Sequence, residues 1–373
     1  MLPHLLTASL TKTAEDKTVC ILVATSGDTG KAALEGFRDV DRTRILVFYP
    51  KDGVSPVQER QMVTQEGENV DVRAVIGNFD DAQAGVKRIF SDETVRAELD
   101  KRGYFLSSAN SINWGRILPQ VVYYISAYCD LVRDGALAMG DKVNFCVPTG
   151  NFGDILAGYY AKQMGLPVGK LVCASNQNNV LTDFLSTGTY TAKREFYKTT
   201  SPSMDILVSS NLERLLYHVT GSDAEVAGLM KSLNETGRYT VRPETLKAIQ
   251  ESFDCGWSSE KQVVGEIRAR YEKDGYLCDT HTAVAFHVAA QKKRDGVPLV
   301  VLSTASPFKF PRSVLEALGH TAPENDFEAM QALEEATGRT APASLAVLRQ
   351  KAERFSTVID PAQIAEVALG CQA

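Results

Sequence analysis

Apolar runs of strand length alternate along this chain with segments that carry apolar residues at helical spacing. The apolar runs predict six strands, over residues 19–24, 44–49, 70–76, 143–147, 171–174 and 299–303. The helical spacing is clearest over residues 57–65, 81–90, 117–130, 213–219, 244–253, 260–271 and 283–292. Strands that alternate with helices are typical of an α/β protein with a mainly parallel sheet. We therefore predict an α/β fold.

The length of 373 residues predicts two domains. We place their boundary near Asn110, where a loop rich in Asn and Ser leads into a long helix. Residues 177–211 are rich in Asn, Ser and Thr and are predicted to be irregular. Residues 324–373 are predicted to form a charged, helical, peripheral appendage.

The composition excludes several kinds of binding partner. The net charge of −6 argues against a nucleic-acid surface. No apolar run approaches the roughly 18 residues of a membrane helix, and the amino terminus lacks the pattern of a signal peptide. The seven cysteines form no C-x-x-C pair and the five histidines form no metal-binding pair, so we expect no metal. Together these features indicate a cytoplasmic protein that acts on a small molecule.

Two glycine-rich turns carry the strongest chemical signal. The first is Ser26-Gly27-Asp28-Thr29-Gly30, and the second is Gly150-Asn151-Phe152-Gly153-Asp154. Each turn lies between an apolar run and a helical pattern, which aims backbone N–H groups and a positive helix end at an anion. Neither turn matches the Walker A loop or the dinucleotide fingerprint. Two such turns favour a phosphorylated or carboxylated ligand, although either turn alone could be an ordinary tight turn.

Two further polar clusters follow predicted strands or loops. Residues 107–116 combine amide and hydroxyl groups with Arg116, whose guanidinium can bind phosphate in a bidentate manner. Residues 303–307 follow the last predicted strand, where ligands bind in open α/β sheets. A helix cap with a surface arginine, and a capped turn, are the structural alternatives for these two clusters.

These four clusters, in this order, resemble the threonine synthase family of fold-type-II enzymes that depend on pyridoxal 5′-phosphate. The matching stretches are ATSGDTG from Ala24, SANSIN from Ser108 with Arg116, and GNFGDILAGY from Gly150. The resemblance covers essentially the whole chain and implies two open, twisted sheets flanked by helices, as in the β subunit of tryptophan synthase. It implies a segment 1–15 that follows the family's lysine, a smaller substrate-side domain 16–110, and a larger cofactor domain 111–373.

The resemblance also implies roles for individual residues. The cofactor phosphate is expected on Gly150, Asn151, Phe152, Gly153 and Asp154, and the pyridine nitrogen on Thr304. The substrate carboxylate is expected on Thr25, Ser26, Gly27, Asp28 and Thr29, and the substrate phosphate on Asn110, Ser111 and Arg116. Ser306 stands where other branches of the family have a histidine, which leaves its role open.

The reaction that the resemblance implies is the conversion of O-phospho-L-homoserine and water to L-threonine and phosphate. The implied cofactor is pyridoxal 5′-phosphate, and the implied assembly is a monomer or a homodimer. Two alternatives remain: a non-catalytic binder of the cofactor or of a phospho-amino acid, and a phospho-lyase that gives 2-oxobutyrate.

One family feature lies outside the printed sequence. The family's Schiff-base lysine belongs to a Phe-Lys-Asp motif upstream of the first strand, and Met1 to Leu10 resemble the helix that follows it. We therefore expect no catalytic lysine in this chain and a truncated sequence, more simply explained as an artefact than as an inactive product. Lys309, in Phe308-Lys309-Phe310, and Lys51 are expected to have other roles.

Overall fold

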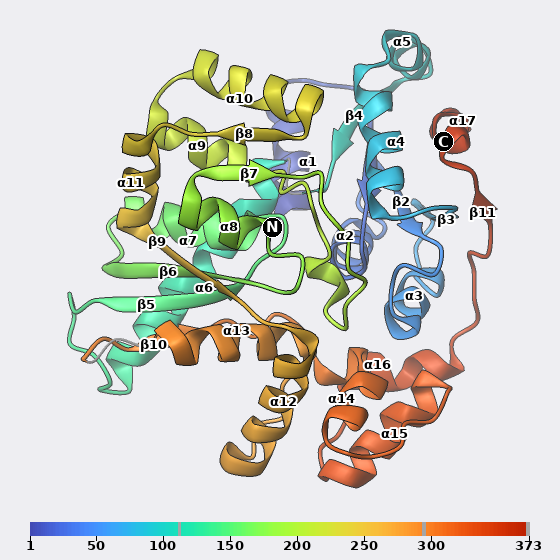
Figure 1. Cartoon of the computed structure of the whole chain (residues 1–373). Helices are drawn as coiled ribbons and strands as arrows, with labels where there is room; N and C mark the ends of the chain where they lie inside the picture. Colours follow the sequence, from blue (N-terminus) through green and yellow to red (C-terminus); the bar gives the residue numbers. More distant parts are fainter. Residues whose placement is uncertain (111–112, 293–295, 371–373) are drawn as a thin grey trace. The chain divides into compact units, whose positions relative to one another are not determined.

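The computed structural model describes residues 1–110, 113–292 and 296–370 (Figure 1). The chain divides into two compact units. Unit 1 comprises residues 1–116 and 338–373, and unit 2 comprises residues 117–337. This division groups residues 338–373 with the first unit, whereas the predicted domain 111–373 grouped them with the second. The reason lies in pairing: the last strand, β11 (Val358–Ile359), adds to the sheet of unit 1.

The sheet of unit 1 has the strand order β11-β3-β2-β1-β4, and all its pairs are parallel. The other strands are β1 (Thr18–Ala24), β2 (Thr43–Pro50), β3 (Val70–Val75) and β4 (Tyr104–Ser108). The α-helices of this unit are α1 (Leu2–Lys12), α2 (Asp28–Phe37), α3 (Pro56–Val63), α4 (Phe79–Ser91), α5 (Glu93–Lys101), α16 (Ala343–Ala346) and α17 (Ile364–Leu369). Its 3-10 turns are η3 (Val347–Gln350) and η4 (Pro361–Gln363).

Alternate residues of β1 supply two different cores, because successive side chains of a strand point to opposite faces. Val19, Ile21 and Val23 pack with residues of α1, α2 and α3. Cys20 and Leu22 pack with residues of α4, α5 and α17. Both faces of the sheet are therefore covered, which explains why the strand is a continuous apolar run.

The main sheet of unit 2 has the order β10-β5-β6-β9 and is also parallel. Its strands are β5 (Val143–Pro148), β6 (Val168–Ser175), β9 (Phe253–Trp257) and β10 (Leu299–Val301). An antiparallel pair of short strands, β7 (Thr189–Thr191) and β8 (Arg238–Thr240), lies apart from it. The α-helices assigned to this unit are α6 (Trp114–Arg133, which starts within unit 1), α7 (Gly153–Gln163), α8 (Val180–Thr187), α9 (Leu212–Thr220), α10 (Asp223–Thr236), α11 (Pro243–Ser252), α12 (Glu260–Asp274), α13 (Thr280–Lys292), α14 (Pro311–Ala317) and α15 (Asp326–Thr337). Its 3-10 turns are η1 (Pro202–Met204) and η2 (Pro307–Lys309).

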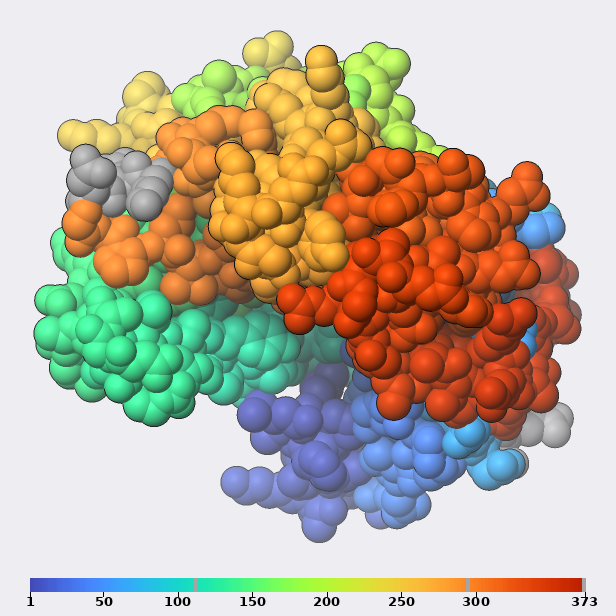
Figure 2. Space-filling view, turned by 90° about the horizontal axis from the view of Figure 1, so that it is seen from below, coloured from blue at the N-terminus to red at the C-terminus, as the bar shows by residue number. Residues whose placement is uncertain are grey.

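Helices cover both faces of this sheet, with α7 and α8 on one side and α13 on the other (Figure 1). The larger core joins β5, β6 and β9 to α6, α7, α8, α9 and α11. On the opposite face α13 approaches closely: a Cβ on Gly256 would lie 2.8 Å from Val288 Cγ1. At one end of the unit α12, α14 and α15 pack together, and their residues lie side by side in Figure 2. No helix of the described residues is long and apolar enough to cross a membrane.

Candidate functional site

The glycine turn of unit 2 joins the end of β5 to the start of α7. Phe152 precedes the helix with φ 64°, a left-handed conformation that is uncommon for a residue other than glycine. Its ring is buried and packs against Phe253, with the ring centroids 5.5 Å apart. This packing holds a strained backbone in place, and such strain concentrates at functional sites.

The carbonyl groups of this turn are tied to the protein, but its N–H groups are not. The hydroxyl of Ser209 donates to the carbonyl of Gly150 at 2.8 Å, and Asn211 Nδ2 donates to the carbonyl of Asn151 at 2.9 Å. Within the described part of the chain, the amide N–H groups of residues 150–155 donate to no protein acceptor. Six consecutive amides at a helix amino terminus, without acceptors, form an arrangement that suits an anion.

The segment 199–211 encloses this turn. A Cβ on Gly150 would lie 3.0 Å from the carbonyl oxygen of Ser203 and 3.1 Å from Met204 Cα, so a larger residue would require the backbone of 203–204 to move. Asn151 Oδ1 and Ser203 Oγ are buried and have no hydrogen-bond partner among the described residues. The turn is thus a narrow, polar cradle.

Asp154, the last residue of the predicted phosphate loop, has its carboxylate engaged by another helix. Tyr124 of α6 donates from its hydroxyl to Asp154 Oδ1 at 3.0 Å and to the Asp154 carbonyl at 2.8 Å. Burial raises the pKa of Asp154 to about 6, although the hydrogen bond from Tyr124 lowers it. Burial also raises the pKa of Tyr124 well above its ordinary value. The side chain of Asp154 therefore links α7 to α6, and its part in phosphate binding stays a prediction.

Thr304 lies at the same edge of the sheet as the glycine turn. Strand β10 pairs with β5 in parallel, so both strands end at this edge. Thr304 is exposed, and the neighbouring Ser303 accepts a hydrogen bond from the Tyr276 hydroxyl at 3.2 Å. Ser306 accepts a hydrogen bond from the Phe308 amide and so caps the turn that follows, which gives this residue a structural role.

In unit 1 the turn after β1 is organised by Thr25, which is buried. Thr25 Oγ1 accepts hydrogen bonds from the amides of Gly27 at 3.0 Å and Gly30 at 2.8 Å. Asp28 Oδ1 accepts a hydrogen bond from Gln58 Nε2 at 3.1 Å, which accounts for an acidic residue in this turn. The contacts of Thr25 and Asp28 are thus internal to the protein, and their substrate roles stay predictions.

Ser26 and Thr29 are the half-buried hydroxyl residues of the same turn. Within the described residues, their amide N–H groups have no acceptor. Amides and hydroxyls of this kind can bind a carboxylate. Of the residues predicted for the substrate carboxylate, these two have the most suitable groups.

Asn110 holds the end of β1 with both ends of its side-chain amide. Asn110 Oδ1 accepts from the Ala24 amide at 3.0 Å, and Asn110 Nδ2 donates to the Ala24 carbonyl at 2.6 Å. Ser111 lies outside the described residues. Arg116 is half-buried in the first turn of α6, still within unit 1. The predicted phosphate role of these three residues stays a prediction.

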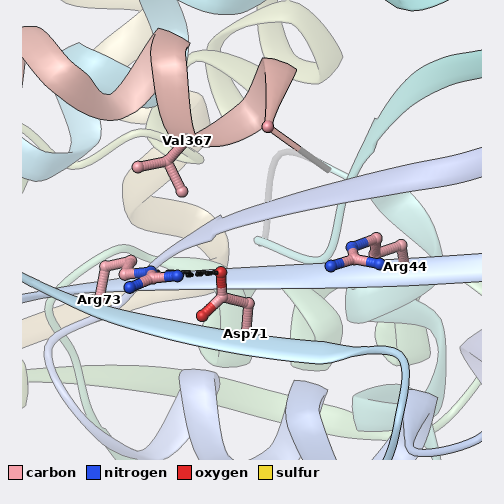
Figure 3. A pocket seen from close by; sticks show the side chains of 5 residues that line it. Arg44, Asp71, Arg73 and Val367 are labelled. Carbon is pink, nitrogen blue, oxygen red and sulfur yellow. Dashed lines mark hydrogen bonds and ion pairs between the residues drawn. The ribbon is translucent and has the colours of Figure 1, made fainter. Parts of the chain in front are cut away.

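A pocket of about 180 Å³ in unit 1 lies elsewhere (Figure 3). Its lining consists of Arg44, Asp71, Arg73, Val367 and Gly370, and Arg73 forms an ion pair with Asp71 at 2.9 Å. Arg44 and Asp71 belong to the amino-terminal ends of β2 and β3. The Ser26 turn follows the carboxyl end of β1 in the same parallel sheet, so this pocket is not the predicted site.

The residues that hold the second turn from outside were not identified from the sequence. Ser209 and Asn211 belong to the stretch that was predicted to be irregular, and they bind the turn through its carbonyl groups. Asn176, at the end of β6, donates to Asp205 Oδ1 at 2.8 Å and thereby helps to order this stretch. The only available signal was its richness in Asn, Ser and Thr, which does not specify a partner.

Solved structures decide the family. The crystal structure of threonine synthase from Brucella melitensis with bound pyridoxal phosphate is 41% identical to this chain, with a TM-score of 0.83. The match covers 98% of this chain and 73% of that one. This chain belongs to the threonine synthase family. The yeast threonine synthase structure agrees, at 33% identity and a TM-score of 0.81 over 98% of this chain and 72% of that one.

The family model described as "Threonine synthase, C-terminal" matches residues 282–368. Threonine synthase from Pseudomonas aeruginosa is 43% identical over 304 residues, which cover 80% of this chain and 62% of that protein. Threonine synthase-like 1 from Homo sapiens is 44% identical over 306 residues. That match spans 80% of this chain but only 41% of the human protein. The predicted family and the α/β fold of type II are confirmed.

Proposed function

We propose that this member of the threonine synthase family binds pyridoxal 5′-phosphate, with the cofactor's phosphate on the turn Gly150–Asp154. The observation that carries the proposal is the run of amide N–H groups over residues 150–155, which have no acceptor among the described residues. The buried hydroxyl of Ser203, which has no partner among the described residues and can donate, and the tight space around Gly150 fit the same group. A phosphate accepts many hydrogen bonds, so this donor set suits it.

We further propose that the chain serves the conversion of O-phospho-L-homoserine and water to L-threonine and phosphate. The cofactor supplies an electron sink for this chemistry, and the protein supplies position and charge. Thr304 would give the pyridine nitrogen a neutral hydroxyl partner, which leaves that nitrogen unprotonated. We assign no Schiff-base role to Lys51 or Lys309.

Substrate binding is proposed for unit 1. The amides and hydroxyls of Ser26 and Thr29 would hold the substrate carboxylate. Arg116, with its planar pair of donors, would hold the substrate phosphate in a bidentate manner, with Asn110 and Ser111 beside it. Because the chain spans 41% of the human relative and 62% of the bacterial one, this activity is proposed from its family and its binding groups.

A pair of glycine variants tests the cofactor proposal. Gly150→Ala would place a methyl group 3.0 Å from the Ser203 carbonyl oxygen, whereas Gly228 of α10 has open space around it, so Gly228→Ala is the matched control. Equilibrium dialysis should show saturable binding of pyridoxal 5′-phosphate by wild type and Gly228→Ala, and at least tenfold weaker binding by Gly150→Ala. Pyridoxal without the phosphate should bind wild type weakly. Equal binding of pyridoxal and its phosphate would contradict the proposal.

Product analysis tests the reaction. The full-length gene product is incubated with O-phospho-L-homoserine and pyridoxal 5′-phosphate, and threonine, 2-oxobutyrate and phosphate are quantified. Threonine and phosphate in equal amounts support the proposal. Mainly 2-oxobutyrate supports the phospho-lyase instead, and cofactor binding without any product supports a non-catalytic binder.

A further inference from the structure

Asp279 is a fully buried carboxylate at the start of α13. Its Oδ1 accepts hydrogen bonds from the His281 amide at 2.8 Å and the Thr282 amide at 3.3 Å. The same oxygen lies 3.0 Å from His281 Nδ1, and Oδ2 accepts from the Thr282 hydroxyl. Two side chains therefore converge on Asp279 in addition to the two amides of a helix cap.

The hydrogen bonds of His281 specify one tautomer of its imidazole ring. Its Nε2 accepts a hydrogen bond from the backbone amide of Ser203 at 3.3 Å, so Nε2 carries no proton. The imidazole proton is then on Nδ1, which donates to Asp279 Oδ1. The ring is buried and packs against Phe310 with a centroid distance of 4.9 Å. Asp279 thus selects the tautomer that can accept from Ser203.

Ser203 connects this pair to the glycine turn. The carbonyl oxygen of Ser203 lies 3.0 Å from the position that a Cβ of Gly150 would take. The amide of the same residue is held by His281. A second bond holds the neighbouring backbone, because the Thr280 hydroxyl donates to the Thr200 carbonyl at 2.7 Å. The start of α13 therefore holds the backbone of residues 200–203, which lies against the Gly150 turn.

Asp279 also reaches the other part of the predicted cofactor site. The hydroxyl of Thr282, bound to Asp279, lies 3.4 Å from the hydroxyl of Ser303. Ser303 directly precedes Thr304, the residue proposed to face the pyridine nitrogen. One buried carboxylate is thus connected to both places where unit 2 would hold the cofactor.

We propose that Asp279 and His281 are positioning residues that fix the Gly150 turn and the Thr304 strand end for the cofactor. This inference rests on the proposed function. An ordinary helix cap explains the two amide bonds to Asp279, but it does not require a buried imidazole whose other nitrogen accepts from a different segment. The connection from Asp279 through His281 to Ser203 is the part that a cap leaves unexplained.

Two substitutions of His281 test its two hydrogen bonds separately. Asparagine places an amide near the position of Nδ1 and loses the acceptor for Ser203, whereas glutamine places an amide oxygen near the position of Nε2. Both remove the imidazole ring, so both lose its packing on Phe310. We expect His281→Asn to weaken binding of pyridoxal 5′-phosphate about three- to tenfold, which corresponds to one lost hydrogen bond. His281→Gln should stay within about twofold of wild type.

Two measurements without the cofactor keep the test independent of the proposed function. Amide hydrogen exchange of residues 203–206 should accelerate in His281→Asn and not in His281→Gln. In the wild-type protein, ¹⁵N NMR should show His281 protonated on Nδ1 alone. Similar exchange in the two variants, or a proton on Nε2, would overturn the positioning role.

The outcomes distinguish a failure of the proposed function from a failure of the positioning role. If wild type shows no saturable binding of pyridoxal 5′-phosphate, the proposed function is wrong, and the residues do not position a cofactor. If wild type binds it but both variants bind equally well, the proposed function stands and the positioning role is wrong. Loss of affinity and exchange protection in His281→Asn alone supports the inference.

Discussion

Tyr124 and Asp154 join two helices at the amino-terminal turn of α7. The Tyr124 hydroxyl lies 3.0 Å from Asp154 Oδ1 and 2.8 Å from the Asp154 carbonyl oxygen, and its ring packs edge-on against Phe145. Gly158 makes this approach possible, because a Cβ there would lie 2.6 Å from Tyr124 Cε1. The start of α7, which carries the proposed phosphate site, is therefore anchored on a buried phenol.

Tyr124→Phe should destabilise the protein, because it leaves two acceptors of Asp154 without their donor. The expected loss is about 1–3 kcal/mol in the free energy of unfolding, measured by urea denaturation. Tyr123→Phe is the matched control, since Tyr123 is 55% exposed on the same helix and should change stability by less than about 0.5 kcal/mol. Equal losses in the two variants would show that the hydroxyl of Tyr124 contributes nothing.

Asp154 should give the protein a pH-dependent stability. Burial raises its pKa from 3.8 to about 6, so the folded state holds the proton more tightly than the unfolded state. Its contribution to stability is therefore largest below pH 4 and is lost as the pH rises through 6. The change is roughly 1–2 kcal/mol, reduced because the residue is half-buried.

Asp154→Asn removes the titrating group and should flatten this part of the stability profile. Urea denaturation of wild type and Asp154→Asn between pH 4 and 7 measures the difference. Tyr124→Phe should move the wild-type transition to higher pH, because the hydrogen bond from Tyr124 lowers the pKa of Asp154. Parallel profiles for wild type and Asp154→Asn would contradict the assignment.

The strands that the sequence revealed are those with continuous apolar runs. β1, β2, β3, β5, β6 and β10 correspond to the six predicted apolar runs. β4 and β9 were missed because their sequences, YFLSS and FDCGW, mix polar residues and glycine into the strand. β11 has two residues, and only its pairing with β3 defines it as a strand. The apolar pattern thus predicts every central strand, but of the four edge strands of the two parallel sheets only β10, and the others depend on tertiary pairing.

The glycine turns were visible in the sequence because their backbone requires particular residues. Gly27 has φ 134°, and a Cβ on Gly150 would make contacts as short as 3.0 Å. The surroundings of the second turn were not visible, because Ser209 and His281 act through backbone groups of residues distant in sequence. Such contacts leave no spacing or period along the chain, so only the fold reveals them.

Gly27→Ala should destabilise unit 1. The backbone of Gly27 is strained for any L residue, and a Cβ there would lie 2.5 Å from the side chain of Gln58. We expect a loss of more than about 1 kcal/mol in the free energy of unfolding. Gly36→Ala, in the helix α2 that Gly27 precedes, is the control: Gly36 is exposed, its new Cβ would meet Pro3 Cγ at an ordinary 3.6 Å, and alanine favours helices. A Gly27→Ala protein as stable as Gly36→Ala would contradict the strain.

Asn110→Asp tests whether the side-chain amide of Asn110 holds the end of β1. The substitution replaces the donor to the Ala24 carbonyl with an acceptor, so a bond of 2.6 Å becomes a repulsion between oxygens. We expect a loss of about 1–3 kcal/mol in the free energy of unfolding. Asn325→Asp is the control, because within the described residues the side chain of Asn325 accepts from the amides of Phe327 and Glu328 and donates to no acceptor, and aspartate caps a helix equally well.

The expected pattern is therefore a destabilised Asn110→Asp beside an unchanged Asn325→Asp, measured by urea denaturation. Amide exchange localises the effect: the Ala24 amide should exchange faster in Asn110→Ala, which loses its acceptor, than in Asn110→Asp, which keeps one. If Asn110→Asp were as stable as wild type, the side chain would not hold β1, and its amide would be available for the substrate phosphate instead. The stability measurement thus decides between clamping of the strand end and ligand binding as the main work of this residue.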